Sequence, residues 1–124
     1  ASAAFEIDRE RTIDFMGEKA RVYSAPMLVR DIELTSGELP LAHLDAGEDS
    51  VGTRVEIDHL AATLMGMKVE VTVTVAAVAG RAVTLEVSAH DGVDTICRGR
   101  HHRFVVDVRT TEARLAAKAA KAGV

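Results

Sequence analysis

Four features of this sequence could support chemistry, and the first is His59 in the segment RVEIDHLAATLMGM. Val55, Ile57 and His59 alternate with charged residues, as do residues on one face of a strand. An imidazole titrates near neutral pH, so His59 could act as a general base or orient a substrate. It could equally be a core histidine bonded to a backbone carbonyl. Small residues follow it in HLAATLMGM, and they leave room for a ligand near the backbone.

Glu33 and Gly52 are two further candidates. Glu33 has an apolar residue on each side, and its carboxylate could orient an imidazole or activate water. The alternative is a solvated helix face, and Asp31 is a nearby competitor for the same role. The N–H of Gly52, in DSVGTRV, could bind a carbonyl oxygen because no side chain blocks the approach. Gly52 could also be an ordinary glycine at the entry to a strand.

The fourth feature is the basic segment CRGRHHRF, residues 97–104. Alternation along a strand would divide its side chains between two faces, with Arg98, Arg100 and His102 on one and His101 and Arg103 on the other. A charged, solvent-facing strand explains this pattern, and a local cationic patch for a phosphorylated ligand is the alternative. Adjacent histidines on a strand point in opposite directions, so we expect no metal site here.

The elements that must position these residues are mostly strands. Residues 5–14 could form a first strand, and residues 26–34 predict a short helix that starts at Pro26. Gly37 and Pro40 should shorten or kink this helix. From residue 50 onward, period-two alternation predicts four long strands joined by short hairpins.

Turn and cap residues set the limits of these elements. The segment AVAGRA and the pair Asp91–Gly92 predict two of the turns. The last strand should run from about residue 94 to residue 108. The alanine-rich tail predicts a helix that Thr110 or Thr111 caps and Gly123 ends.

Consecutive hairpins make an antiparallel sheet with one apolar face, which needs a cover. The helix near residues 26–44 is the main candidate for that cover. We therefore expect an α+β fold in one domain, residues 1–124: the hot-dog fold, a curved antiparallel sheet around a central helix, with a C-terminal helix added. Exposed sheet edges and apolar surface predict a homodimer paired edge to edge.

Composition limits the classes of function. The chain has 124 residues, of which 48% are hydrophobic and 27% charged, and its formal net charge of −4 does not suggest nucleic acid as a partner. A single cysteine, Cys97, excludes an internal disulfide. No apolar run approaches the ~20 residues of a membrane span, and the first residues lack the apolar region of a signal peptide. We expect a cytoplasmic protein that binds neither nucleic acid nor membrane.

Over residues 20–108 the sequence resembles the hot-dog thioesterases related to fluoroacetyl-CoA thioesterase. The resemblance lies in the run GTRVEIDHLAATLMGMKV, then in VAGRAVTLEVSAHD, then in GRHHRFVV. It implies a dimer with active sites at the subunit interface, and hydrolysis of a short acyl-CoA thioester. Coenzyme A would be part of the substrate, and no separate cofactor is implied.

The resemblance also implies roles for individual residues. The family uses a glutamate, a glycine nineteen residues later and a histidine twenty-six residues later, which map to Glu33, Gly52 and His59. Glu33 and His59 would activate a water molecule, or Glu33 would attack directly, and the Gly52 amide would stabilise the oxyanion. Some of the cations of the basic segment would bind the CoA phosphates, namely Arg98, Arg100, His102 and Arg103.

One position departs from the family pattern. A threonine normally stands eight residues before the glutamate, and here that residue is Ala25, next to Ser24. Alanine can be neither a nucleophile nor a hydrogen-bond donor. A second hypothesis is therefore a CoA-ester binding or sensing protein that has lost catalysis. The sequence leaves open the acyl group, whether Ser24 or water replaces the threonine, and whether dimers pair into a tetramer.

Overall fold

The computed structural model of the chain describes residues 1–41 and 43–124, and the side chains of these except residues 39–41. The elements, in chain order, are β1 (Ser2–Glu6), β2 (Thr12–Ile13), the 3₁₀ helix η1 (Glu18–Ala20), β3 (Val22–Tyr23), α1 (Ala25–Leu41), β4 (Glu48–His59), β5 (Lys68–Ala79), β6 (Ala82–His90), β7 (Thr95–Asp107) and α2 (Val108–Ala122).

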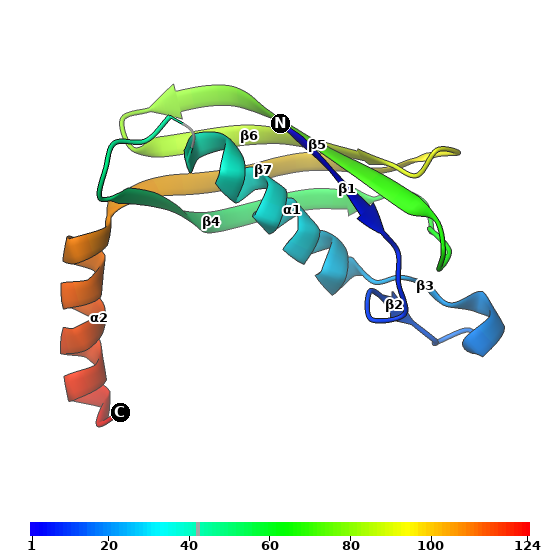
Figure 1. Cartoon of the computed structure of the whole chain (residues 1–124), viewed down its shortest axis with the longest axis horizontal. Helices are drawn as coiled ribbons and strands as arrows, with labels where there is room; N and C mark the ends of the chain where they lie inside the picture. Colours follow the sequence, from blue (N-terminus) through cyan, green and yellow to red (C-terminus); the bar gives the residue numbers. More distant parts are fainter. Residues whose placement is uncertain (42) are drawn as a thin grey trace.

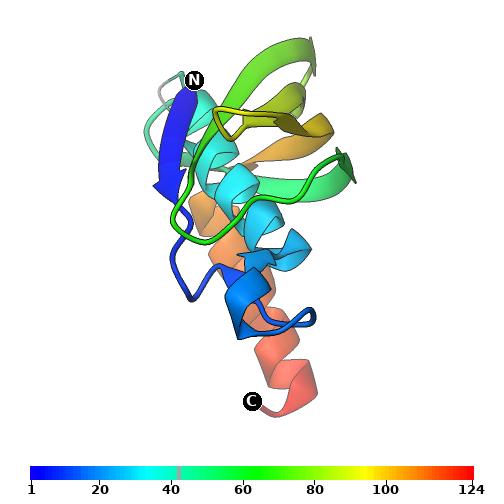
Figure 2. The ribbon, with the colours of Figure 1, turned by 90° about the vertical axis from the view of Figure 1, so that its right-hand side faces the viewer.

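A five-stranded antiparallel sheet in the order β1-β5-β6-β7-β4 curls around α1 (Figure 1). In the view turned by 90°, α1 lies along one side of the sheet, which is its concave face (Figure 2). Strands β2 and β3 form a separate two-stranded sheet near the start of α1. The hot-dog fold predicted from the sequence is confirmed.

The alternating residues of the long strands form the core on the concave face. Every second residue of β6 is buried, as the sequence predicts, and so are Val69, Val71 and Val73 in the first half of β5, whereas Val75 is 45% exposed. Helix α1 supplies the residues that meet the buried ones. The buried members of this cluster include Val69, Val71, Val73, Val87 and Ala89 from the strands and Leu28 and Ile32 from the helix. Removal of these side chains from water is the main contribution that holds α1 against the sheet.

The placement of β4 differs from the prediction. The sequence suggested a hairpin between β4 and β5, but β4 lies at the opposite edge and pairs with β7, from Glu48↔Asp107 to His59↔Cys97. The connecting residues 60–67 can span up to about 26 Å when extended. That is more than the roughly 14 Å between strands that are three positions apart in a sheet.

The first predicted strand, residues 5–14, is divided into β1 and β2. The chain turns between them, where the Arg11 N–H donates to Asp8 Oδ1 at 3.0 Å.

Helix α1 is longer than predicted, with 17 residues that continue through Gly37 and Pro40. A Cβ at Gly37 would lie 3.6 Å from the Arg103 guanidinium, so the glycine stands where a side chain of β7 approaches the helix. The contact of α1 with the sheet outweighs the weak helix propensity of this stretch.

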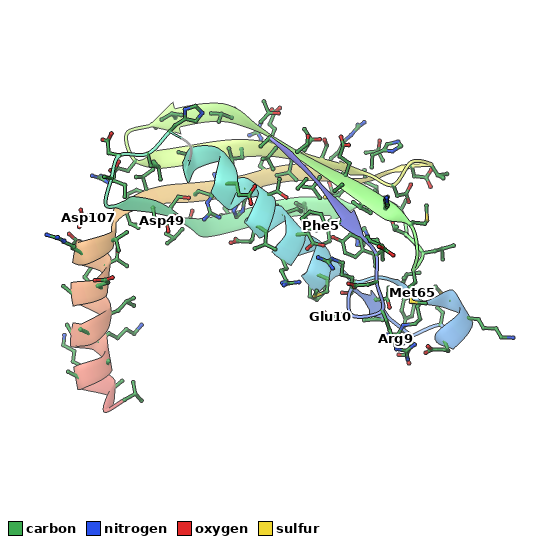
Figure 3. All side chains as sticks on the ribbon, viewed as in Figure 1. Phe5, Arg9, Glu10, Asp49, Met65 and Asp107 are labelled. Atoms are coloured by element: carbon green, nitrogen blue, oxygen red, sulfur yellow. The ribbon has the colours of Figure 1, made fainter. Side chains whose placement is uncertain are left out.

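Helix α2 extends from the end of β7, and none of its side chains is buried (Figures 1 and 3). Its cap is Asp107, whose Oδ1 accepts from the Thr110 N–H at 2.8 Å, so the predicted cap at Thr110 or Thr111 was wrong. Gly123 ends the helix with φ 74°, as predicted. In the described ranges, no helix is long and apolar enough to cross a membrane.

Candidate functional site

Glu33 lies above a buried polar floor formed by β7. Its Oε1 is 3.4 Å from His101 Nε2, and its Oε2 is 3.5 Å from Arg103 Nη1. The side chains of His101 and Arg103 are 0% and 8% exposed, whereas that of Glu33 is 41% exposed. The carboxylate is therefore held from below and open to a ligand on its other side.

Gly52 of β4 is adjacent to this carboxylate. A Cβ added at Gly52 would lie 3.0 Å from the Glu33 carboxyl carbon and closer still to Oε1. No side chain larger than hydrogen fits while Glu33 stays in place. One chain thus brings together Glu33 and Gly52, two of the three residues that the sequence selected.

Arg103 is fixed by the backbone and side chain of Ser50. Its Nε donates to Ser50 Oγ at 2.8 Å and its Nη2 donates to Ser50 O at 2.7 Å. These two bonds orient the planar guanidinium and leave Nη1 pointing at Glu33 and at His101 Nε2, which is 3.2 Å away. Arg103, predicted as a phosphate ligand, is instead a buried partner of Glu33.

His101 was not selected from the sequence, although its face was predicted correctly. Its full burial lowers the pKa of the imidazole, Glu33 opposes that effect, and the Arg103 charge adds to it. The signal that could have shown its burial is Val105, an apolar residue two positions beyond Arg103 on the same face.

His59 ends β4 and lies beside a cavity of about 390 Å³. The cavity lining includes Phe15, Tyr23, Ser24, Ala25 and Leu60. Partial burial lowers the pKa of His59 from its usual value, so the neutral form of the imidazole predominates at pH 7. A neutral imidazole can accept a proton, as a general base must.

A single chain does not bring His59 to Glu33. His59 is seven positions beyond Gly52, which amounts to roughly 23 Å along β4. The His59 side chain nevertheless lies on the face toward which a Cβ at Gly52 would point, because the register with β7 shifts between Gly52 and Arg54. An odd separation would place them on opposite faces of a regular strand, and the bulge corrects this.

The position that the resemblance assigns to a threonine is the first residue of α1, Ala25, which lines the cavity beside His59. Ser24 is buried, and its Oγ accepts from the Met27 N–H at 3.4 Å, as a residue that caps a helix does. The Ser24 hydroxyl thus contributes to the start of α1.

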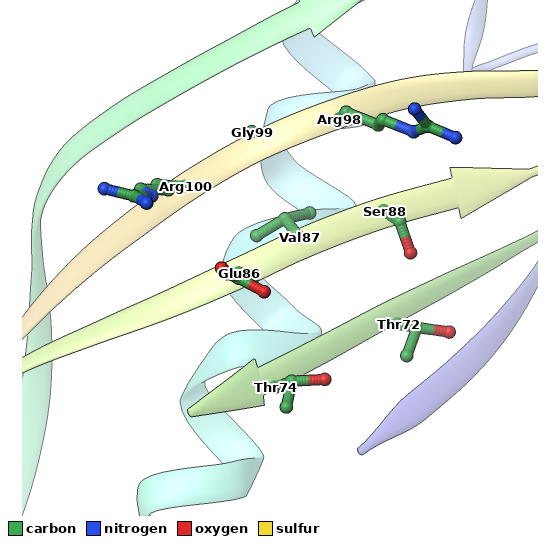
Figure 4. A pocket seen from close by; sticks show the side chains of 8 residues that line it. All are labelled: Thr72, Thr74, Glu86, Val87, Ser88, Arg98, Gly99 and Arg100. Carbon is green, nitrogen blue, oxygen red and sulfur yellow. The ribbon is translucent and has the colours of Figure 1, made fainter. Parts of the chain in front are cut away.

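The remaining cations of the basic segment lie on the convex face, away from α1 (Figure 4). There Arg98 and Arg100 border a cleft of about 360 Å³ with Thr72, Thr74, Glu86, Val87, Ser88 and Gly99. Asp58 pairs in register with Arg98, and both Glu56 and Glu86 pair with Arg100. His102 shares this face, so these three residues do not form one patch with Arg103.

Proteins that are similar to this chain in sequence and in fold include thioesterases. A profile of the fluoroacetyl-CoA-specific thioesterase family matches residues 7–109. The fluoroacetyl-CoA thioesterase of Streptantibioticus cattleyicolor is 36% identical over 101 residues, which cover 82% of this chain and 73% of the relative.

Solved structures agree with this match. A phenylalanine-to-alanine variant of the fluoroacetyl-CoA-specific thioesterase FlK in complex with fluoroacetate and CoA has a TM-score of 0.85 at 30% identity, covering 95% of this chain and 98% of that one. A thioesterase superfamily member from Thermus thermophilus has a TM-score of 0.90 at 28% identity, covering 98% and 90%. The chain therefore belongs to the fluoroacetyl-CoA-specific thioesterase family, a family of thioester hydrolases.

Proposed function

We propose that this protein is a homodimeric acyl-CoA thioesterase in which Glu33 and Gly52 of one subunit face His59 of the partner subunit. The observation that carries the proposal is the division of the site along β4. Glu33 and Gly52 meet at one end of this strand, and His59 lies at its other end on the same face. The family membership supports the reaction class, and a relative has been solved with CoA bound.

The exposed edge of β4 offers a way to unite the two halves. In the described chain, β4 has a strand neighbour on one side only, so its outer backbone groups are free to pair. With the extra residue of the bulge left out of the count, Gly52 and His59 are each three residues from Glu56. An antiparallel pairing of two β4 strands centred on Glu56 would place Gly52 opposite His59 of the partner subunit, with the two Cα atoms about 5 Å apart.

In this arrangement the reaction is a water attack. The neutral imidazole of His59, oriented by Glu33, takes a proton from water, and the hydroxyl oxygen bonds to the thioester carbon. The Gly52 N–H stabilises the oxyanion, and one such donor is typically worth about 10²–10³ in rate. The C–S bond then breaks, and the imidazolium returns the proton to the CoA thiolate.

Direct attack by Glu33 is the second route. Its carboxylate oxygen would form an anhydride with the acyl group and release CoA, and water would then hydrolyse the anhydride. A burst of CoA release before steady state would indicate this route, and its absence the water route. Because Ala25 carries no hydroxyl and Ser24 is buried at the start of α1, we assign the threonine's role to neither residue.

The CoA phosphates would be bound by Arg98, Arg100 and His102. The carboxylates across the strands oppose the charge of the two arginines, which favours weak and salt-sensitive binding. Arg103 stays with Glu33 and would position it.

The second candidate function is a CoA-ester binding or sensing protein without catalysis, and Ala25 is the observation that favours it. Calorimetry with CoA and a non-hydrolysable thioester analogue separates the two. Tight binding of the analogue without turnover of any acyl-CoA would support the binding protein.

The main test is steady-state hydrolysis of a panel of acyl-CoAs by the wild type, Glu33→Gln and His59→Ala. Each variant alone should be inactive. When the two are unfolded together and refolded, half of the dimers should be mixed, and each mixed dimer has one intact site. Recovery of about a quarter of the wild-type activity is expected. No turnover by the wild type, or full activity of His59→Ala, would refute the thioesterase proposal. No recovery of activity in the refolded mixture would refute a site shared between two subunits.

A further inference from the structure

A second buried charge cluster lies on the other side of α1. Asp31 is fully buried, and Arg11 donates to both of its oxygens, from Nε to Oδ2 at 2.9 Å and from Nη2 to Oδ1 at 3.1 Å. The Tyr23 hydroxyl donates to Asp31 Oδ2 as well. A buried carboxylate requires such partners, and here both oxygens have them.

This cluster is distinct from the Glu33 site. Asp31 and Glu33 are two residues apart in α1, so their side chains leave the helix about 200° apart. Burial and the Asp31 carboxylate raise the pKa of Tyr23, so the phenol keeps its proton and always donates. The phenol ring is therefore anchored at its hydroxyl end.

The Tyr23 ring also lies beside the imidazole of His59. The two ring centroids are 6.5 Å apart with an interplanar angle of 81°, an edge-to-face contact, and both residues line the same cavity. Among the hydrogen bonds of residues 1–41 and 43–124, none involves the His59 side chain. In the part of the chain that the structure describes, this edge-to-face contact with the Tyr23 ring restricts how the imidazole turns.

We propose that Tyr23, anchored by Asp31 and Arg11, is a positioning residue for His59. The bond to Asp31 fixes the phenol ring, and the ring fixes the plane of the imidazole that accepts the proton. Small errors of position are expensive in catalysis, since a displacement of about 1 Å can lower a rate by about 10²-fold. The kinetic part of this inference rests on the proposed thioesterase function.

The test compares three variants for kcat, KM and the NMR signals of ¹³C-labelled histidine. Tyr23→Leu removes the ring and should lower kcat by about 10- to 100-fold while KM changes by less than about threefold. Tyr23→Phe keeps the ring and loses the anchor, so it should lower kcat by about two- to fivefold. Thr35→Val is the matched control, because it removes a buried hydroxyl that bonds to the Asp31 carbonyl at 2.8 Å and not to its carboxylate.

The NMR signals separate positioning from stability and from the proposed reaction. His59 is assigned among the five histidines by the signal that His59→Ala lacks. Its signals should shift in Tyr23→Leu and stay in place in Thr35→Val. Unchanged His59 signals in folded Tyr23→Leu would overturn the inference. Absence of wild-type turnover would refute the thioesterase while the NMR result still decides whether Tyr23 positions His59.

Discussion

Replacement of Gly52 by alanine should lower activity without unfolding the protein. The added Cβ would lie 3.0 Å from the Glu33 carboxyl carbon, whereas ordinary contacts begin at 3.4 Å. Oε1 is closer still, so the carboxylate oxygen must retreat by about 1 Å to regain van der Waals distance. The backbone N–H of residue 52 stays, so the variant tests the position of Glu33 and not the loss of an oxyanion donor.

The expected effects on stability and rate differ in size. Alanine restricts the unfolded chain, which stabilises the folded protein by about 0.5–1 kcal/mol. The partly exposed Glu33 carboxylate would make weaker contacts with Arg103 and His101, and this loss costs a similar amount. The free energy of unfolding should therefore change by less than about 1 kcal/mol. A displacement of about 1 Å should lower kcat/KM by about 10²-fold, which corresponds to about 2.7 kcal/mol in the barrier.

Urea unfolding and steady-state hydrolysis of the best acyl-CoA in the panel measure the two quantities. Gly37→Ala is the matched control, because its Cβ would meet the Arg103 guanidinium at 3.6 Å, an ordinary contact. This variant should keep the wild-type kcat/KM, and its free energy of unfolding should rise by about 1 kcal/mol because alanine has the higher helix propensity. Wild-type activity in Gly52→Ala would show that the contact between Gly52 and Glu33 has no part in the reaction.

Two further predictions follow from the charges of the site. Burial lowers the pKa of His59 below its usual 6.5, so the midpoint of the acid limb of kcat/KM should lie below pH 6.5, and a midpoint above pH 7 would contradict a neutral base. Arg103→Lys loses the two hydrogen bonds to Ser50, so the free energy of unfolding in urea should fall by about 1–3 kcal/mol. Its kcat should also fall, because Glu33 loses the guanidinium that pairs with it. A stable Arg103→Lys variant with unchanged kcat would show that the bonds to Ser50 do not hold the site.

Alternation in the sequence was sufficient to predict the inner faces of the long strands. Val69, Val71 and Val73 are fully buried as predicted, and the turns fall at Gly80 and Gly92, both with positive φ. Alternation does not say which strand lies beside which, because the same inner face suits any neighbour. The sequence therefore could not place β4 at the edge beside β7.

The site was predicted in part for the same reason. The resemblance selected Glu33 and Gly52, which the structure places side by side, but it could not show what holds the carboxylate. That depends on Arg103, which appeared to be a surface cation by its residue type and is buried against Ser50 and His101. Only the pairing of β7 with β4 in the sheet, and the position of Glu33 on α1, show that its charge points inward.

The bulge after Gly52 links the architecture of β4 to the proposed chemistry. Without the extra residue, Gly52 and His59 would lie on opposite faces of the strand, and no pairing of two β4 edges could bring both into one cleft. With the bulge, each subunit carries the Glu33 carboxylate near one end of β4 and the His59 imidazole at the other end, on the same face of the sheet. A monomer would then hold two incomplete half-sites, so thioesterase activity per chain should depend on protein concentration wherever the dimer dissociates.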